Sequence, residues 1–191
     1  MQIDFFSRLK ARYGLSEASS NLLLNIMETA SYKKKDIIGG KEHNERYTIF
    51  VDRGLVRTYM VRGKKNHTIF FSFEGDLLGP FPGLIPAEIP ELYCEALEDT
   101  IVYRAPRTVM EELFSSSLEL SCWARKMLEG KIREYNFFFT DYFYEEKTTQ
   151  YKKFLVDYPE LIRRVPLKDI AGYLNVTPQS LSRIRAKGWR F

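Results

Sequence analysis

The spacing of apolar residues along this 191-residue chain changes twice, and each spacing predicts a different kind of element. Up to about residue 31 the apolar residues recur at helical spacing, with Phe5 and Leu9 in one expected helix and Ser16 capping a second. Short β-branched and aromatic runs between turn signals then predict strands at residues 47–52, 55–61, 67–73, 92–97 and 100–104. Such short, regularly interrupted strands favour an antiparallel β-roll of the jelly-roll kind.

Helical spacing returns after Pro106 and predicts helices at residues 108–115, 118–144 and 145–158. The middle helix spans about 40 Å at 1.5 Å per residue, which is longer than a small roll can cover. Its surplus apolar stripe predicts pairing with the same helix of a second copy. The expected dimerisation residues are Leu120, Trp123, Met127, Ile132, Tyr135 and Phe139. Burial of this stripe against the chain's own domains is the alternative.

Residues 165–185 predict two short helices joined by a tight corner. Pro166 suits the start of the first helix, and Asn175 can adopt the left-handed conformation that ends it. Thr177 is a good N-cap for the second helix, with Pro178 at its first position. This pattern is typical of a helix-turn-helix, although an ordinary helical hairpin with a solvated polar face would look similar.

The outward face of the second helix carries hydrogen-bonding side chains and cations but no carboxylate. In the major groove Gln can pair with adenine and Arg with guanine, while hydroxyl groups bind phosphates. We therefore expect Gln179 and Arg183 to contact base edges and their neighbours to bind mostly phosphate. The expected DNA-binding residues are Thr177, Gln179, Ser180, Ser182, Arg183, Arg185 and Lys187.

The charge distribution supports a polyanionic partner. Residues 163–191 contain seven cations and one acid, a net charge of +6, so the other residues carry −2 of the total of +4. With 45% hydrophobic residues the chain can still build a core. No signal-peptide pattern and no apolar run near the roughly 18 residues of a membrane span occur, which predicts a cytoplasmic protein without a membrane partner.

Candidate chemistry for catalysis or cofactor binding is sparse. The two histidines, His43 and His67, are too few for the three-ligand metal site of a cupin-like roll. The two cysteines, Cys94 and Cys122, are too few for an iron–sulfur cluster and form no CxxC pair, although a redox switch through either is left open. We expect no enzyme activity, no metal and no cofactor. The rival hypothesis is a ligand-binding or enzymatic roll whose helical tail serves assembly only.

The whole layout resembles the Crp/Fnr family of bacterial transcription regulators. The resemblance rests on residues 165–185, on Phe73-Glu-Gly-Asp76 followed by Gly79, and on Gly54 in a strand-turn-strand step. It implies an α+β fold with an antiparallel, jelly-roll-like sensor roll in residues 1–117, a dimerisation helix in 118–144 and a helix-turn-helix domain in 145–191. It also implies a cytoplasmic homodimer on palindromic double-stranded promoter DNA, with RNA polymerase as a further partner. The implied effector-pocket residues are Phe73, Gly75, Asp76, Gly79 and Tyr93.

Departures from the family pattern concern the effector. Family members that bind cyclic AMP place a glutamate after a glycine for the ribose and an Arg-Ser pair for the phosphate. Here Pro80 follows Gly79, and residues 86–93 contain Glu88 and Glu91 but no arginine. Carboxylates repel a phosphate, so we expect no cyclic AMP binding. The effector stays unidentified: a neutral or cationic ligand, or none if the roll is only a scaffold.

Departures also occur at the DNA end. Gln179 occupies a position that is often glutamate and Pro178 one that can be arginine, whereas Arg183 matches the family's base-contacting arginine. Only six residues follow Arg185, so we expect the family's β-wing to be absent or truncated.

Overall fold

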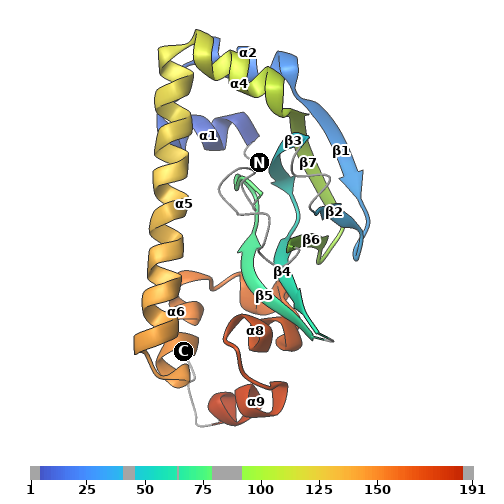
Figure 1. The fold of residues 1–191 in the computed structure, drawn as a ribbon, viewed down its shortest axis with the longest axis vertical. Helices are drawn as coiled ribbons and strands as arrows, with labels where there is room; N and C mark the ends of the chain where they lie inside the picture. Colours follow the sequence, from blue (N-terminus) through green and yellow to red (C-terminus); the bar gives the residue numbers. More distant parts are fainter. Residues whose placement is uncertain (1–4, 41–45, 64, 79–91, 187–191) are drawn as a thin grey trace.

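The computed structural model describes residues 5–40, 46–63, 65–78 and 92–186 of the chain. Its strands are β1 (Glu28–Tyr32), β2 (Ile37–Gly39), β3 (Tyr47–Arg53), β4 (Val56–Arg62), β5 (Lys65–Ser72), β6 (Leu92–Ala96) and β7 (Thr100–Pro106). Its helices are α1 (Phe5–Tyr13), α2 (Glu17–Ile26), α4 (Arg107–Ser116), α5 (Leu118–Tyr144), α6 (Lys147–Asp157), α7 (Leu161–Arg164), α8 (Leu167–Tyr173) and α9 (Pro178–Ala186). Figure 1 shows α5 along one side of the molecule, with the strands beside it and α6 to α9 gathered at one end.

The strands form two antiparallel sheets, ordered β1-β7-β3 and β2-β6-β4-β5. Alternation along β3 sends Ile49 and Val51 to the inner side of the roll and Phe50 to the outer side. The inner side chains come from both sheets and form the roll core: Ile38, Ile49, Val51, Val56, Leu78, Cys94, Ala96 and Val102. The predicted α+β architecture with an antiparallel roll is therefore confirmed.

The turn between β3 and β4 requires glycine. Gly54 has a φ of 116°, and a Cβ at this position would lie 2.8 Å from the Cα of Thr100. Its backbone N–H donates to Glu74 Oε1 over 3.0 Å, which joins this turn to the one that follows β5.

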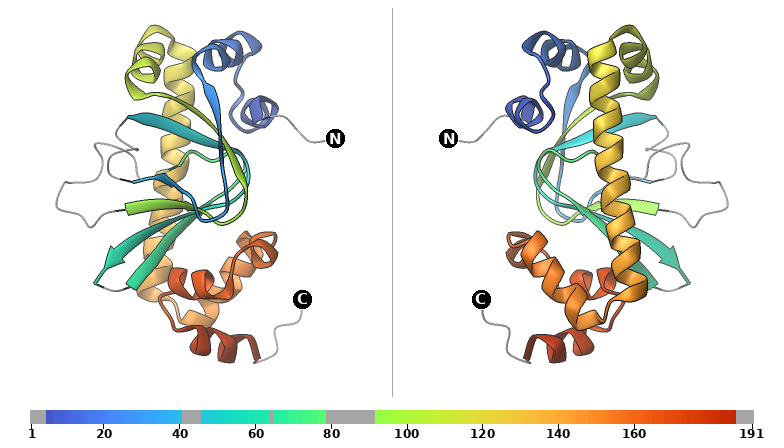
Figure 2. Two further views of the ribbon diagram at one scale, coloured as in Figure 1. Left: turned by 90° about the vertical axis from the view of Figure 1, so that its right-hand side faces the viewer. Right: turned by 90° about the vertical axis from the view of Figure 1, so that its left-hand side faces the viewer.

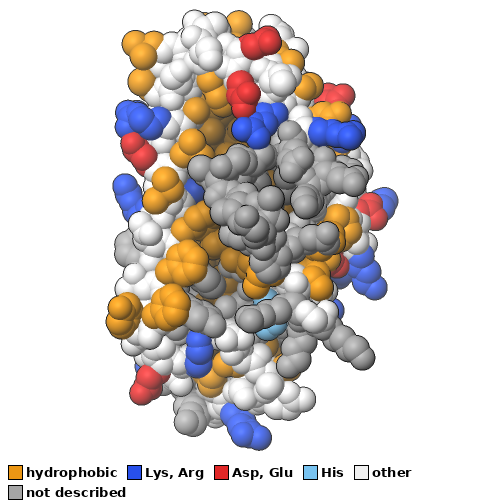
Figure 3. All heavy atoms as spheres, viewed as in Figure 1, with side chains coloured by type: hydrophobic (Ala, Val, Ile, Leu, Met, Phe, Trp, Pro, Cys, Tyr) orange, Lys and Arg blue, Asp and Glu red, His pale blue; other side chains and the backbone are white. Residues whose placement is uncertain are grey.

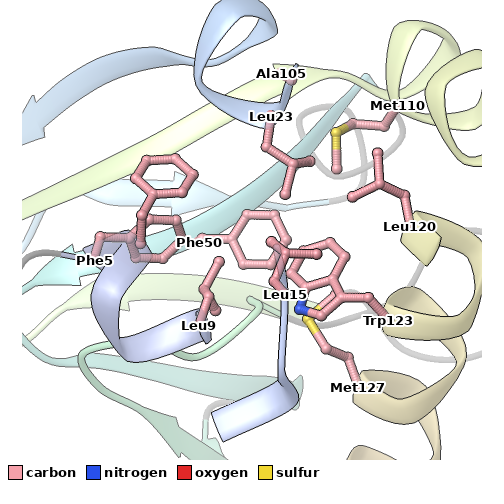
Figure 4. Close-up of a cluster of buried hydrophobic side chains, with 11 residues drawn as sticks. Phe5, Leu9, Leu15, Leu23, Phe50, Ala105, Met110, Leu120, Trp123 and Met127 are labelled. Carbon is pink, nitrogen blue, oxygen red and sulfur yellow. The ribbon is translucent and has the colours of Figure 1, made fainter. Parts of the chain in front are cut away.

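A second cluster lies on the outer side of β3 and β7, where α1, α2, α4 and the first half of α5 cover the sheet (Figure 4). This helical cluster includes Leu120, Trp123 and Met127, which are 0%, 2% and 5% exposed. The Trp123 and Phe50 ring centroids lie 5.9 Å apart. These three α5 residues therefore pack within their own protomer, which corrects their assignment to the dimer seam. Helical spacing alone could not tell this burial from contact with a second copy.

The opposite face of α5 keeps an exposed apolar stripe. Leu128, Ile132, Phe139 and Phe143 are 37%, 54%, 53% and 70% exposed, and hydrophobic side chains are visible over α5 in Figure 3. Tyr135, between them in sequence, instead stacks on Phe70 of β5 at 4.3 Å between centroids, and burial raises the pKa of Tyr135 to about 12. Of the six expected seam residues, Ile132 and Phe139 are thus the two whose side chains stay about half exposed to solvent.

The predicted strands from residue 47 onward are all present, with ends shifted by a few residues. The expectation that helical structure extends to about residue 31 was wrong, because β1 pairs with β7 from Glu28 to Tyr32. That ladder of tertiary hydrogen bonds outweighs a weak local pattern. The three-residue strand β2 and the one-turn helix α7 were also missed. Among the described helices none is long and apolar enough to cross a membrane.

Candidate nucleic-acid interface

The corner between α8 and α9 has the local geometry that the sequence predicts. Asn175 adopts a φ of 51°, and the Val176 N–H donates back to the Ala171 carbonyl over 2.9 Å. These contacts satisfy carbonyl groups at the end of α8. Thr177 caps α9, because its Oγ1 accepts from the Ser180 N–H over 3.1 Å, and Pro178 is the first residue of the helix.

Buried apolar side chains hold α8 and α9 together. Ile170 of α8 and Leu174, the C-cap residue of that helix, are 2% and 1% exposed, and Leu181 of α9 is fully buried. They belong to an interdomain cluster that also contains Leu55, Phe71 and Leu97 of the roll. The helix-turn-helix is therefore packed directly on the roll, and Figure 2 shows α8 and α9 below the sheets from two sides.

The outward side of α9 brings together the residues expected to bind DNA. Gln179, Ser182, Arg183 and Arg185 are exposed, and so is Thr177 at the start of the helix. Ser180 is half-buried. Lys187 lies outside the described residues. The arginines lie in the last turn of α9, where a cation interacts favourably with the helix dipole.

The charged side chains that are exposed near the outward side of α9 are fewer than the sequence count suggests. Arg164 is held by two roll carboxylates, with its Nη2 2.8 Å from Glu74 Oε1 and 2.6 Å from Glu98 Oε1. The single acid of the segment, Asp169, is 3% exposed and pairs with Arg57 of β4. Removing one cation and the one acid from the surface leaves exposed cations at Arg163, Lys168, Arg183 and Arg185. The exposed charge of this part of the described chain is purely positive.

The residues expected to line an effector pocket contact different elements of the structure. The ring of Phe73 packs near Tyr158 of α6, with centroids 6.3 Å apart. Asp76 is 4% exposed, accepts from the Phe73 N–H over 3.1 Å and lies 3.6 Å from Lys131 Nζ of α5. Tyr93 stacks on Tyr59 at 5.5 Å.

Gly75 supplies a turn with a φ of 92°. Gly79 and residues 80–91 lie outside the described residues. The motif from Phe73 to Asp76 thus joins the roll to α5 and to the C-terminal helices, because Glu74 of the same turn binds Arg164.

Metal-binding and thiol chemistry are limited in the described part of the chain. No group of three or more His, Cys, Asp or Glu side chains there could hold a metal ion. Cys94 is a free thiol in the roll core, and its Sγ lies 3.5 Å from Thr58 Oγ1. Cys122 is also free and lies half-buried on α5.

Ion pairs that were not predicted from the sequence connect the helix-turn-helix to the roll. Arg57 contacts both Asp169 and Glu95, and its Nε lies 2.8 Å from Glu95 Oε2. Nothing in the local pattern of β4 indicates that Arg57, on the outer side of the roll, contacts the helix-turn-helix. Its alternation with the apolar residues Val56 and Met60 was the one available signal, and it does not identify the partner.

Solved structures with the same fold are known, although no family model matches the chain and no curated protein matches its sequence. The fold is similar to that of FixK2 from Bradyrhizobium japonicum, with a TM-score of 0.69, 22% identity, and 85% of this chain covering 84% of that one. It is also similar to a CooA mutant from Carboxydothermus hydrogenoformans, with a TM-score of 0.72, 18% identity, and 94% of this chain covering 83% of that one.

A protein from Eubacterium rectale described as a transcriptional regulator of the Crp/Fnr family gives a TM-score of 0.69 at 16% identity, with 90% of this chain covering 82% of that one. The structural neighbours across the chain are Crp/Fnr family transcription regulators. The order of roll, long helix and C-terminal helices in this chain is the Crp/Fnr architecture.

Proposed function

We propose that this protein is a sequence-specific DNA-binding transcription regulator of the Crp/Fnr type, which binds a two-fold promoter site as a homodimer. The observation that carries the proposal is the outward face of α9. Its exposed Gln179, Ser182, Arg183 and Arg185 combine base-reading and phosphate-binding groups with no exposed carboxylate. A solvated hairpin face would be expected to mix acids with these cations.

Dimerisation through α5 is supported by the exposed apolar stripe. Leu128, Ile132 and Phe139 follow the four- and seven-residue spacing of a coiled-coil seam, on the face opposite the protomer's own core. Two copies related by a two-fold axis would then present two α9 helices, which major-groove binding requires about 34 Å apart.

We further propose that this regulator works without cyclic AMP. A buried phosphate needs a paired cation. Among the described residues, the roll core is formed by apolar side chains, the Cys94 thiol and the Thr58 hydroxyl, and none of these groups is a cation. Arg57, which could have replaced the family's arginine, instead binds Glu95 and Asp169 on the other side of β4. A neutral ligand or a purely structural role of the roll fits these contacts better.

Selection of bound fragments from a random DNA pool tests the proposed function and supplies the site. We expect a palindromic sequence whose affinity falls steeply as salt rises, because phosphate contacts release counterions. Arg183→Ala should lose about 1–3 kcal/mol on that sequence and relax the preference at one base pair in each half-site.

The exposed Arg53 at the end of β3 provides the control, and Arg53→Ala should bind like the parent. Failure to enrich any sequence, or parent-like binding by Arg183→Ala, contradicts the proposal.

A further inference from the structure

Two arginines connect the roll to the C-terminal helices. One belongs to the roll and the other to the C-terminal helices. Arg57 of β4 reaches Asp169 of α8, while Arg164 at the end of α7 reaches back to Glu74 in the turn after β5. The second pair is bidentate, with Arg164 Nη1 and Nη2 lying 3.1 and 2.8 Å from the two Glu74 oxygens. Such paired geometry fixes orientation as well as distance.

Close packing accompanies these ion pairs. A Cβ on Gly172 of α8 would lie 3.3 Å from Thr68 Oγ1 of β5, which is tighter than an ordinary van der Waals contact, so the helix and the strand approach closely here. The Phe71 ring of β5 lies 5.6 Å from the Tyr173 ring of α8. In Figure 1, α8 lies directly beside β5. The first helix of the helix-turn-helix is therefore docked on the sheet through a polar and an apolar contact.

The polar contact at Asp169 is not balanced. One guanidinium, that of Arg57, serves two carboxylates, Glu95 and Asp169, so the group carries an excess negative charge. The Asp169 side chain is only 4% exposed, and its Oδ2 has no hydrogen-bond partner within the described residues. Burial raises the pKa of Asp169, although Arg57 and Lys168 act against the rise and Glu95 adds to it. A partly unpaired buried carboxylate opposes docking, whereas Arg57 favours it.

The same strands connect this contact to the interior of the roll. Arg57 pairs across the ladder with Glu95, and the next residues, Thr58 and Cys94, pair with each other. Because successive side chains alternate, Thr58 and Cys94 face the roll core, where their hydroxyl and thiol are in contact. Any shift of β4 against β6 caused from inside the roll would also move Arg57 relative to Asp169.

We propose that Arg57 and Asp169 act in opposite directions on the docking of α8 on the roll, Arg57 favouring it and the partly unpaired Asp169 carboxylate opposing it, and that this docking sets the position of α9. This inference rests on the proposed DNA-binding function. It differs from a merely structural ion pair in one respect: the two partners affect docking in opposite directions. Removing Arg57 leaves two carboxylates without their cation, while neutralising Asp169 removes the excess charge and keeps an acceptor for Arg57.

The test compares Arg57→Met with Asp169→Asn in the full-length protein, and uses hydrogen exchange of the α8 backbone to measure docking without DNA. We expect exchange in α8 to become about tenfold or more faster in Arg57→Met and slower than the parent in Asp169→Asn. The matched control is Arg104→Met, because Arg104 pairs with Glu28 inside the roll, with its Nε 2.7 Å from Glu28 Oε1, and should leave α8 unchanged. The same direction of change in both variants overturns the proposed charge imbalance.

The second measurement is affinity for the selected DNA. We expect the two variants to shift the dissociation constant in opposite directions, by roughly fivefold or more each, as is usual for coupling between sites. If both variants bind DNA like the parent while Arg183→Ala loses affinity, docking of α8 does not affect DNA binding. The further inference is then wrong, and the proposed function stands. If the parent itself selects no DNA, the proposed function fails, and the exchange experiment still decides whether Arg57 and Asp169 control docking.

Discussion

Ile132→Glu combined with Phe139→Glu should convert a dimer into folded monomers. Both side chains lie on the exposed stripe of α5 and are 54% and 53% exposed in the single chain. Full burial of a large apolar side chain contributes about 1.5–3 kcal/mol, so the half that is still exposed contributes about 0.8–1.5 kcal/mol. Two such residues in each protomer give roughly 3–6 kcal/mol. At 1.4 kcal/mol per factor of ten, dimerisation should weaken by about 10² to 10⁴-fold.

Sedimentation velocity over a range of micromolar concentrations measures this change directly. A matched control places carboxylates one residue further along, at the exposed Arg133 and Thr140, which lie off the stripe. That control variant should stay dimeric. Both variants should keep the parent's circular dichroism, because none of the four side chains is in the protomer's core. Met127 is unsuitable for this test, because it is 5% exposed within the helical cluster and a glutamate there would disrupt the protomer.

A parent protein that is monomeric at micromolar concentration would refute the proposed seam. So would a double variant whose dimer dissociates at the same concentration as the parent. Loss of secondary structure in the double variant alone would show that the stripe is needed by the protomer, which again contradicts the assignment.

Three further outcomes follow from the contacts described above. Leu181→Ala should lower the free energy of unfolding by about 2–5 kcal/mol in thermal or denaturant melts, since the Leu181 side chain of α9 is fully buried in the interdomain cluster. Ser182→Ala, at an exposed position, should change it little. Burial alone would raise the pKa of Glu74, but hydrogen bonds from Arg164 and the Gly54 N–H outweigh it and hold the pKa below its ordinary value. The contribution of Glu74 to the free energy of unfolding is therefore present above about pH 4.3 and lost as the pH falls through the lowered pKa. Glu74→Gln should reduce the drop in melting temperature on acidification. An unchanged dependence of melting temperature on acid pH would contradict this. Isothermal titration with cyclic AMP or cyclic GMP should give no binding heat, and a dissociation constant in the low micromolar range would show that another cation holds the phosphate.

Local signals explain which parts of the site could be predicted from the sequence. The corner between α8 and α9 depends on Asn175, Thr177 and Pro178, whose conformational preferences act over one or two residues. The bounds of α5, Leu118–Tyr144, also agree with the prediction, because helical spacing is strong over 27 residues. Periodicity gives the apolar face of a helix but not the surface that covers it. Leu120, Trp123 and Met127 were accordingly assigned to a partner although their own protomer buries them.

The docking of the helix-turn-helix on the roll could not be predicted in this way. Arg57 and Asp169 are 112 residues apart in the chain, and Arg164 and Glu74 are 90 apart. Neither pair follows from a local spacing, and each arginine had an equally reasonable alternative role, toward a cyclic phosphate or toward DNA. Only the tertiary arrangement decides between these uses. Long-range ion pairs of this kind cannot be predicted from residue spacing in a single sequence.

The attachment of α5 at one end has a mechanical consequence for the other. The first half of the helix is clamped in the helical cluster, while the far end is tied to α6 by Gln150, whose Nε2 donates to the Asp141 and Glu145 carbonyls over 2.7 and 2.9 Å. The 27 residues between these ends form a rod of about 40 Å. A tilt of only about 5° at the clamped end displaces the other by roughly 3.5 Å, close to the rise of about 3.4 Å per base pair of DNA. Substitutions around Trp123, far from any nucleotide, would therefore alter which operator spacing two copies can span.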